Sequence, residues 1–349
     1  MNNAILSASA LALLCAAATT SAQITIPMVT VGNPGNPGDT RGTDTADGHV
    51  GQYDLGAVGV AFSIGKYDVT VSQYTAFLNA VAQTDTYGLY NSNMASDLTS
   101  AGITRSGSNG SYSYFVIPGK GNHPVTYVSW YDAARFCNWM SNGQPTGLGE
   151  VPGSTEAGSY NLMGNAGFPT YNGTGLYRIP TQSEWYKAAY YDPGIGGANN
   201  YWQFATRTNT VPGNIVGSGA NMANYYYYNG STYILSVTQS ASYRTSQNYL
   251  TDVGAFMGSP STYGTYDQSG DAHNWNDSVL GGASRGVRGG SWDSFSSDLS
   301  ASSQGYNTPT YESAGIGFRM ASEITPEPTA LSLIFAGGLL LSRRKRPSV

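Results

Sequence analysis

Residues 263–275 read Tyr-Gly-Thr-Tyr-Asp-Gln-Ser-Gly-Asp-Ala-His-Asn-Trp, and residues 288–292 read Arg-Gly-Gly-Ser-Trp. Both stretches are rich in Gly, Asp, Asn or Ser, which favour turns and loops, and each of them ends on a tryptophan. Residues 191–265, directly before them, are long and loop-rich. Irregular segments of this length inside a compact domain usually carry function or bind ions.

Three helices upstream of these stretches are predicted by capping boxes, in which a Ser or Thr side chain and a later side chain satisfy each other's backbone N–H groups. The boxes begin at Thr70, Ser129 and Thr181, and each leads into apolar residues at helical spacing. Brief strand-like runs lie at residues 58–64, 112–117 and 125–128. The sequence therefore predicts an α+β fold with few short helices, short strands and much coil.

The composition limits the possible partners. Charged residues make up 11% of the chain, whereas an ordinary soluble protein has about 25%. The surface must therefore consist largely of Gly, Ser, Thr, Asn and Tyr. Aromatic residues reach 12%, which is not the composition of a disordered chain. The net charge is -5 and no basic stripe is present, so a nucleic-acid partner is not expected.

Residues 1–22 are predicted to be a secretory signal. An apolar run of small residues extends from Ala4 to Ala18, and Thr20-Ser21-Ala22 offers the small side chains that signal peptidase needs. A buried apolar helix is the alternative. Residues 23–50 are rich in Gly, Pro, Thr and Asp, and are predicted to lead into the domain as an extended segment.

Residues 326–349 have the composition of a sorting tail, with a Pro-Glu-Pro box, an apolar run at residues 330–341 and a basic end. The box and the basic end consist of Pro326, Glu327, Pro328, Arg343, Arg344, Lys345 and Arg346. This order resembles the PEP-CTERM signal of Gram-negative bacteria. The resemblance implies export, recognition by an exosortase, transient association of the tail with the inner membrane, and a final place at the cell surface or in the extracellular matrix. A plain C-terminal membrane anchor is the alternative, because a basic cluster after an apolar run stays on the cytoplasmic side.

Six phrases follow one another in a fixed order, at residues 64–70, 124–133, 178–185, 263–275, 288–292 and 317–319. The third reads Arg-Ile-Pro-Thr-Gln-Ser-Glu-Trp and the last reads Gly-Phe-Arg. Together they resemble the formylglycine-generating enzyme family, also called sulfatase-modifying factors. The resemblance covers residues 51–322 and implies a single loop-rich domain with a C-type-lectin-like fold. It also implies structural calcium in many members, and in the authentic enzyme a copper ion, held by two cysteines, that oxidises a sulfatase cysteine to formylglycine.

The copper-binding cysteines of the family are missing from this chain. The matching positions hold Ser294 and Leu299, so no catalytic residue is predicted, and copper is not expected because Cu(I) selects thiolate ligands. Of the two cysteines present, Cys15 lies in the predicted signal and Cys137 shares a helix face with apolar residues. A cysteine on such a face is typically a core residue, which predicts a buried structural thiol.

The loop at residues 270–275 matches a family segment that binds calcium, with Asp271 in place of Asn and Asn274 in place of Glu. Gly270 and Ala272 would add backbone carbonyls. Asn224 matches a second calcium position. Because Ca²⁺ takes about six to eight oxygen ligands, usually including carboxylates, a calcium site and a metal-free turn both remain open here.

Family position also places Trp275, Ser291, Trp292 and Ser294 around the former active site. Aromatic faces and hydroxyls suit sugar rings or peptide segments, which makes this region a candidate binding pocket; the alternative is that both tryptophans belong to the core. Ser291 and Ser294 have no convincing histidine and acid in the sequence, so a serine hydrolase is not predicted.

Three functions compete for this combination of features. The first is a non-catalytic surface or matrix module that binds glycan, peptide or another envelope component, and the missing cysteines and the sorting tail favour it. The second is an enzyme of the same fold with non-copper chemistry. The third is a structural envelope protein whose domain is only a scaffold. Formylglycine generation itself is disfavoured because the thiolates are absent.

Overall fold

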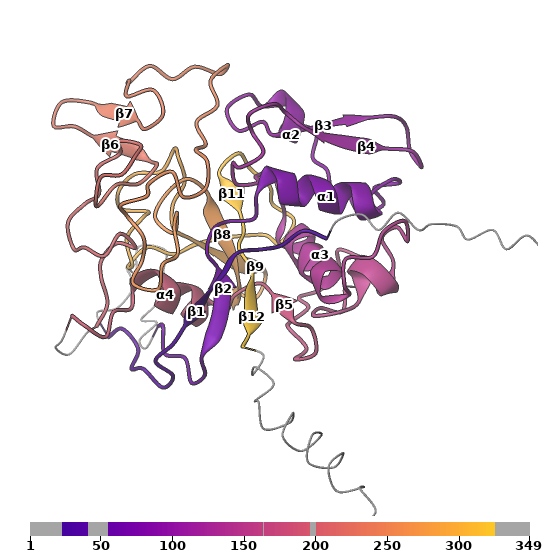
Figure 1. The fold of residues 1–349 in the computed structure, drawn as a ribbon, viewed down its shortest axis with the longest axis horizontal. Helices are drawn as coiled ribbons and strands as arrows, with labels where there is room; N and C mark the ends of the chain where they lie inside the picture. Colours follow the sequence, from indigo (N-terminus) through magenta and orange to yellow (C-terminus); the bar gives the residue numbers. More distant parts are fainter. Residues whose placement is uncertain (1–22, 41–54, 163, 196–199, 325–349) are drawn as a thin grey trace, which may run out of the picture.

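This computed structural model describes residues 23–40, 55–162, 164–195 and 200–324 (Figure 1). They include three capped helices and two four-stranded sheets, in which neighbouring strands are often not consecutive in sequence. Both predicted sorting segments, residues 1–22 and 326–349, lie outside the described residues. Within the described residues, no helix combines the length and the apolar character that a membrane span requires.

The first sheet has the strand order β1-β2-β12-β5 and is antiparallel throughout. Its strands are β1 (Met28–Val31), β2 (Phe62–Gly65), β12 (Ala321–Glu323) and β5 (Tyr177–Arg178). Strand β1 comes from the segment that the sequence predicts to lead into the domain. The sheet therefore joins residues from both ends of the described chain.

The second sheet has the strand order β10-β9-β8-β11, in which only the β8–β11 pair is parallel. Its strands are β10 (Gly305–Asn307), β9 (Ser284–Arg288), β8 (His273–Leu280) and β11 (Ile316–Gly317). The loop that ends in Trp275 enters β8, and the Arg-Gly-Gly-Ser-Trp stretch leaves β9. This sheet thus brings together the loops that the sequence singles out.

Two hairpins project from the outer loops in Figure 1. One consists of β3 (Ile103–Ser106) and β4 (Ser113–Val116), and the other of β6 (Tyr226–Tyr228) and β7 (Tyr233–Leu235). Each is an isolated antiparallel pair, so its position depends on contacts with neighbouring loops.

All three predicted helices are confirmed, and each begins with the predicted capping box. Thr70, Ser129 and Thr181 are the N-caps, and in each box the side chains and backbone N–H groups bond reciprocally. The helices are α1 (Val71–Val81), α3 (Trp130–Ser141) and α4 (Gln182–Tyr190). Two short elements are not predicted from the sequence: the single turn α2 (Asn93–Ser96) and the short π-helix at Pro152–Glu156.

The strand predicted at residues 125–128 is wrong. Tyr127 has a φ of 58°, in the left-handed region, and this interrupts the extended backbone. The N–H of Val125 donates to the carbonyl of Val69, whereas that of Tyr127 donates to Ser313, so the segment bridges two different neighbours. The other two runs form only the shorter strands β2 and β4.

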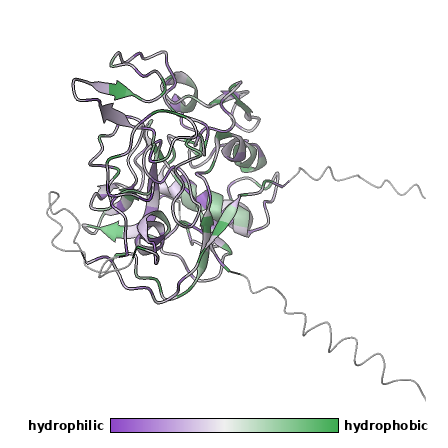
Figure 2. Cartoon of the chain, turned by 60° about the vertical axis from the view of Figure 1, so that its left-hand side comes forward, coloured by the Kyte–Doolittle hydropathy of each residue, from purple (hydrophilic) through white to green (hydrophobic). Residues whose placement is uncertain are grey.

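The largest part of the core lies around α1 and α3. Tyr74, Phe77, Phe136 and Phe318 are fully buried, and most of their ring contacts are edge-to-face, such as the one at 5.3 Å between Phe77 and Phe136. Cys137 lies in the same cluster, fully buried, as predicted. Figure 2 shows that much of the surrounding coil is hydrophilic. The described residues form one loop-rich α+β domain, which confirms the predicted fold class.

Candidate functional site

The predicted calcium loop is held by hydrogen bonds from the protein itself. Asp271 is fully buried, and its Oδ1 accepts bonds from Asn224 Nδ2 at 2.8 Å and from the backbone N–H of Thr251 at 3.1 Å. Its Oδ2 accepts a bond from Thr251 Oγ1 at 3.1 Å. Burial, with the Asp267 carboxyl nearby, raises the pKa of Asp271 well above its usual range. Asn224 and Asp271 are thus brought together as hydrogen-bond partners of each other.

Asn274 belongs to a separate internal network. Its Oδ1 accepts bonds from Arg319 Nε at 2.7 Å and from Trp185 Nε1 at 2.9 Å. Its Nδ2 donates to Asp68 Oδ1 at 3.0 Å and to the carbonyl of Ala272 at 3.3 Å. Arg319 Nη2 donates to the same Asp68 oxygen at 2.6 Å, and neither side chain of this ion pair is exposed. A guanidinium this close to Asn274 repels a cation.

As arranged here, the loop of Gly270, Asp271, Ala272 and Asn274 does not offer Ca²⁺ the free oxygens that it needs. No group of three or more His, Cys, Asp or Glu side chains in the described parts of the chain is placed to hold a metal ion. The fit of these residues to structural calcium is therefore poor, and the calcium expectation is best decided by experiment.

We expect that removal of divalent cations leaves the thermal unfolding midpoint unchanged, because protein donors already satisfy Asp271 and Asn274. Scanning calorimetry of protein dialysed against EDTA, before and after calcium is restored, measures this. A fall of several degrees that calcium reverses would contradict the expectation and support the structural calcium that the family resemblance implies.

An open cleft of about 420 Å³ lies beside the start of β8. Polar side chains and an aromatic ring line it: His273, Ser291, Asp293, Ser294, Phe295 and Asp298. Residues from the 307–316 segment, including Tyr311, also line it. None of the described residues that line the cleft is a lysine or an arginine. Two of the four predicted pocket residues, Ser291 and Ser294, therefore lie at this cleft.

The other two predicted pocket residues lie elsewhere. Trp275 is fully buried in the main core, where its Nε1 donates to the carbonyl of Val128 at 2.9 Å. Trp292 is 4% exposed and stacks on Tyr249 with centroids 5.0 Å apart. Leu299, at the second cysteine position of the family, is buried against other apolar side chains. These three side chains support the fold around the cleft.

His273 lies beside Ser294, a proximity that the sequence does not reveal because the two residues are far apart in the chain. Its Nε2 is 3.3 Å from Ser294 Oγ. The N–H of Gly290 donates to His273 Nδ1 at 3.2 Å, and this bond favours the neutral tautomer that is protonated at Nε2. Burial lowers the pKa of His273, which keeps the ring neutral.

This tautomer determines what the serines can do. In that tautomer His273 donates to Ser294 Oγ, whereas a general base must accept the proton of the serine. Ser291 Oγ donates to Asp293 Oδ1 at 2.6 Å and lies 3.0 Å from Ser294 Oγ. In this arrangement Ser291, Ser294 and His273 form one hydrogen-bonded group at the cleft.

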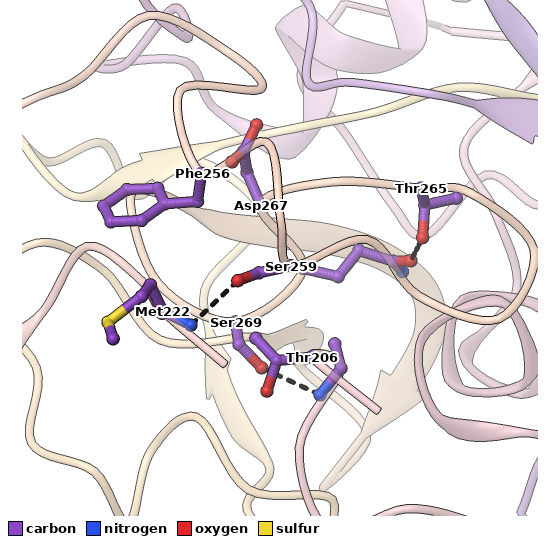
Figure 3. Close-up of a pocket in the computed structure, with 10 residues that line it drawn as sticks. Thr206, Met222, Phe256, Ser259, Thr265, Asp267 and Ser269 are labelled. Atoms are coloured by element: carbon purple, nitrogen blue, oxygen red, sulfur yellow. Dashed lines mark hydrogen bonds between the residues drawn. The ribbon is translucent and has the colours of Figure 1, made fainter. Parts of the chain in front are cut away.

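A second, enclosed cavity lies beneath the long loops (Figure 3). It is lined by Asp267, Thr206, Ser259 and Ser269, among others, and its volume of about 10 Å³ has room for about one water molecule. Ser259 Oγ accepts a bond from the N–H of Met222 at 2.8 Å, and Ser269 Oγ accepts one from that of Ala205 at 3.1 Å. This cavity is too small for an organic ligand.

Asp267 on this cavity makes stability depend on pH. Burial, together with the nearby Asp68 carboxyl, raises the pKa of Asp267 to about 7. The folded state therefore binds the proton more tightly than the unfolded state, and this stabilisation is lost as pH rises from about 4 through about 7. We expect a lower urea midpoint at pH 8 than at pH 5, and a smaller difference in Asp267→Asn. An equal pH difference in both proteins would contradict the assignment to Asp267.

The fold and the site geometry define a loop-rich α+β domain of the sulfatase-modifying-factor type. Residues 41–324 match the family described as "Sulfatase-modifying factor enzyme 1-like domain". The chain belongs to this family. No curated protein matches the sequence.

Several solved structures are similar in fold. The crystal structure of CarF is 24% identical, with a TM-score of 0.48, and the match covers 86% of this chain and 99% of CarF. Variable protein 1 of Treponema denticola is 18% identical, with a TM-score of 0.45 and coverage of 85% and 94%. PvdO from Pseudomonas aeruginosa is 16% identical, with a TM-score of 0.43 and the same coverage, 85% and 94%.

Proposed function

We propose that this protein is an exported, non-catalytic binding module of the bacterial cell surface, and that the cleft beside β8 is its binding site. The observation that carries the proposal is the chemistry at Ser294. Where the authentic enzymes of the family hold a copper-binding cysteine, this chain presents a hydroxyl that hydrogen-bonds to a neutral histidine.

Copper chemistry has no thiolate pair among the described residues. Cys137 is the free cysteine there, and it is fully buried in the core. Burial raises the pKa of its thiol well above the usual value, which disfavours the thiolate that Cu(I) selects. Formylglycine generation therefore does not fit this chain.

An enzyme with non-copper chemistry is the alternative, and the proximity of His273 to Ser294 is the observation that favours it. We expect no covalent labelling of Ser294 by a fluorophosphonate probe, because the bond from Gly290 favours the tautomer in which His273 donates to Ser294 rather than accepting its proton. Intact-protein mass spectrometry, with a serine hydrolase as a positive control, measures this. A mass increase that Ser294→Ala abolishes would show that the serine is activated, and would overturn the non-catalytic proposal.

Export supports a role in binding at the surface. The signal predicted at residues 1–22 and the sorting tail predicted at residues 326–349 imply signal peptidase and exosortase as processing partners. The low charge of the chain suits a surface rich in hydroxyl and amide groups. Cell fractionation with an antibody to the domain, in the wild-type strain and in an exosortase deletion, tests this part of the proposal. Retention of the protein in the cytoplasm would contradict it.

A glycan-and-peptide array with the purified protein tests the binding function. Two variants accompany it: Tyr311→Ala, which removes a ring from the cleft wall, and Phe115→Ala, which removes an exposed ring from β4, outside the cleft. We expect saturable binding that Tyr311→Ala weakens and Phe115→Ala preserves. Binding to no member of the array, or equal loss in both variants, would contradict the proposed site.

A further inference from the structure

Four aromatic rings pack together on the β6–β7 hairpin and the adjacent loop, three of them exposed and Tyr226 half-buried. We call them the aromatic shelf: Tyr226, Tyr228, Tyr233 and Phe295. The ring of Tyr233 is central, with centroid distances of 5.2 Å to Tyr226 and 5.0 Å to both Tyr228 and Phe295. Tyr228, Tyr233 and Phe295 are 51%, 39% and 46% exposed. Rings that pack together while remaining this exposed are typical of a binding surface.

The aromatic shelf is continuous with the cleft. Phe295 belongs to both, because it lines the cleft and packs against Tyr226 and Tyr233. The N–H of Tyr226 donates to the carbonyl of Ser294 at 2.9 Å, which joins the hairpin directly to the cleft wall. A ligand that occupies the cleft can therefore extend over the rings without a break.

The charge of the cleft is one-sided. Asp293 and Asp298 line it, and none of the described lining residues is a lysine or an arginine that would balance them. His273, the remaining titratable nitrogen base on the wall, is held neutral. A cation is therefore attracted here in two ways: by the charge of the two carboxylates and by the faces of the exposed aromatic rings beside them.

The hydrogen-bonding groups narrow the ligand further. Around the cleft they are side-chain groups, namely the hydroxyls of Ser294 and Tyr311 and the amide of Asn307. Two edge strands of the second sheet reach the cleft, β11 with two residues and β10 with three, and the N–H of Ile316 already donates to the carbonyl of Ser313. An extended peptide would find little backbone to pair with, whereas the hydroxyls of a sugar ring find partners on several sides.

We propose that the cleft and the aromatic shelf form one site for a saccharide that carries free amino groups. This inference rests on the proposed binding function and names its ligand class. Sugar rings stack their apolar faces on the shelf, ring hydroxyls bond to the serine, tyrosine and asparagine side chains, and ammonium groups pair with Asp293 and Asp298.

Titration calorimetry of the full-length protein with three probes tests the proposal: a glucosamine hexamer, its fully N-acetylated counterpart and hexalysine. We expect the glucosamine hexamer to bind at least about tenfold more tightly than the acetylated hexamer, because acetylation removes the charge that the carboxylates recognise. Added salt should weaken the interaction. Equal affinity for the two hexamers would overturn the inference, and so would tight binding of hexalysine alone.

Two substitutions locate the site. Tyr233→Ala and Asp293→Asn should each weaken binding of the glucosamine hexamer by about tenfold. The matched controls, Phe115→Ala on β4 and Asp252→Asn, alter an exposed ring and an exposed carboxylate outside the cleft, and should leave the affinity unchanged. Unchanged binding in both site variants overturns the inference, provided that their melting temperatures match the wild type; should Asp293→Asn prove unstable, Asp298→Asn replaces it.

The outcomes separate this inference from the proposed function. If a neutral glycan or a peptide binds the wild type but not Tyr311→Ala, the proposed binding function stands and the assignment of an amino sugar as the ligand is overturned. If no probe and no member of the array binds, both the proposed binding function and the amino-sugar assignment are overturned.

Discussion

Replacing Arg319 with methionine should lower the free energy of unfolding by about 3–5 kcal/mol, because it leaves a buried carboxylate without its counter-ion. Arg319 has no exposed side-chain surface and donates to Asp68, Asn274 and the backbone carbonyls of Gly65 and Tyr266. Methionine fills part of the volume but donates none of these bonds. Asp68 Oδ2 has no hydrogen-bond partner among the described residues even in the wild type, so few other hydrogen bonds would stabilise the carboxylate once the arginine is lost.

The pH dependence of this variant identifies the cause. Burial raises the pKa of Asp68 to about 6 against the opposing effect of Arg319, and loss of the arginine should raise it further. The folded variant would then bind a proton more tightly, and its deficit relative to the wild type should shrink as pH falls towards about 6 and stay constant below it. Urea unfolding at pH 5 and pH 8 measures this.

Arg105→Met is the matched control for Arg319→Met. Arg105 pairs with Asp85 at 2.9 Å, but its side chain is 29% exposed, so the loss should be about 1 kcal/mol or less. A similar loss in both variants, or an Arg319→Met deficit that does not change with pH, would show that the buried pair is not the source of the effect.

Replacing Gly270 with alanine should destabilise the domain by about 3–5 kcal/mol, from backbone strain and a backbone clash together. Gly270 has a φ of +88°, and a Cβ there would lie 2.2 Å from the carbonyl oxygen of Asn224. That carbonyl accepts the N–H of Asp271 at 2.8 Å, so the clash would disturb the hydrogen bonds that hold the buried carboxyl.

Gly264→Ala separates the two causes. Gly264 has a similar φ of +81°, but a Cβ at that position meets nothing within 4 Å. The control should therefore show the strain alone, about 1–2 kcal/mol. Thermal unfolding of both variants measures the difference, and equal losses would mean that the contact with Asn224 has no energetic consequence.

The helices were predictable because their signals are local. A capping box needs only four consecutive residues, and the ones that begin at Thr70, Ser129 and Thr181 each form as expected. The run at residues 125–128 shows the opposite case: its apolar residues suggest a strand, but the left-handed backbone of Tyr127 and its bond to Ser313 are set by tertiary contacts. Strand β1 is also not predictable from its own residues, because it forms by pairing with β2, which is distant in sequence.

The site was predictable only in part, for the same reason. The sequence shows that the copper-binding cysteines of the family are absent and that Ser294 stands at one of their positions. Ser294 does line the cleft. For the two tryptophans the sequence also allowed the alternative that they are core residues, and the burial of Trp275 agrees with that alternative. The bond between Gly290 and His273 and the junction of Tyr226 with Ser294 link residues that are distant in sequence. No spacing rule connects them, so only the fold reveals the tautomer and the continuous shelf.

The place of β12 affects how the chain acquires its fold. This strand, Ala321–Glu323, lies between β2 and β5 in the interior of the first sheet, although it follows nearly all the other described residues in sequence. A nascent chain that has not yet produced these residues has a gap in the middle of that sheet. Closing it requires contacts between residues far apart in the chain, which makes folding slow. The first sheet therefore cannot be completed until the residues of β12 have been synthesised, which suits the export that we propose.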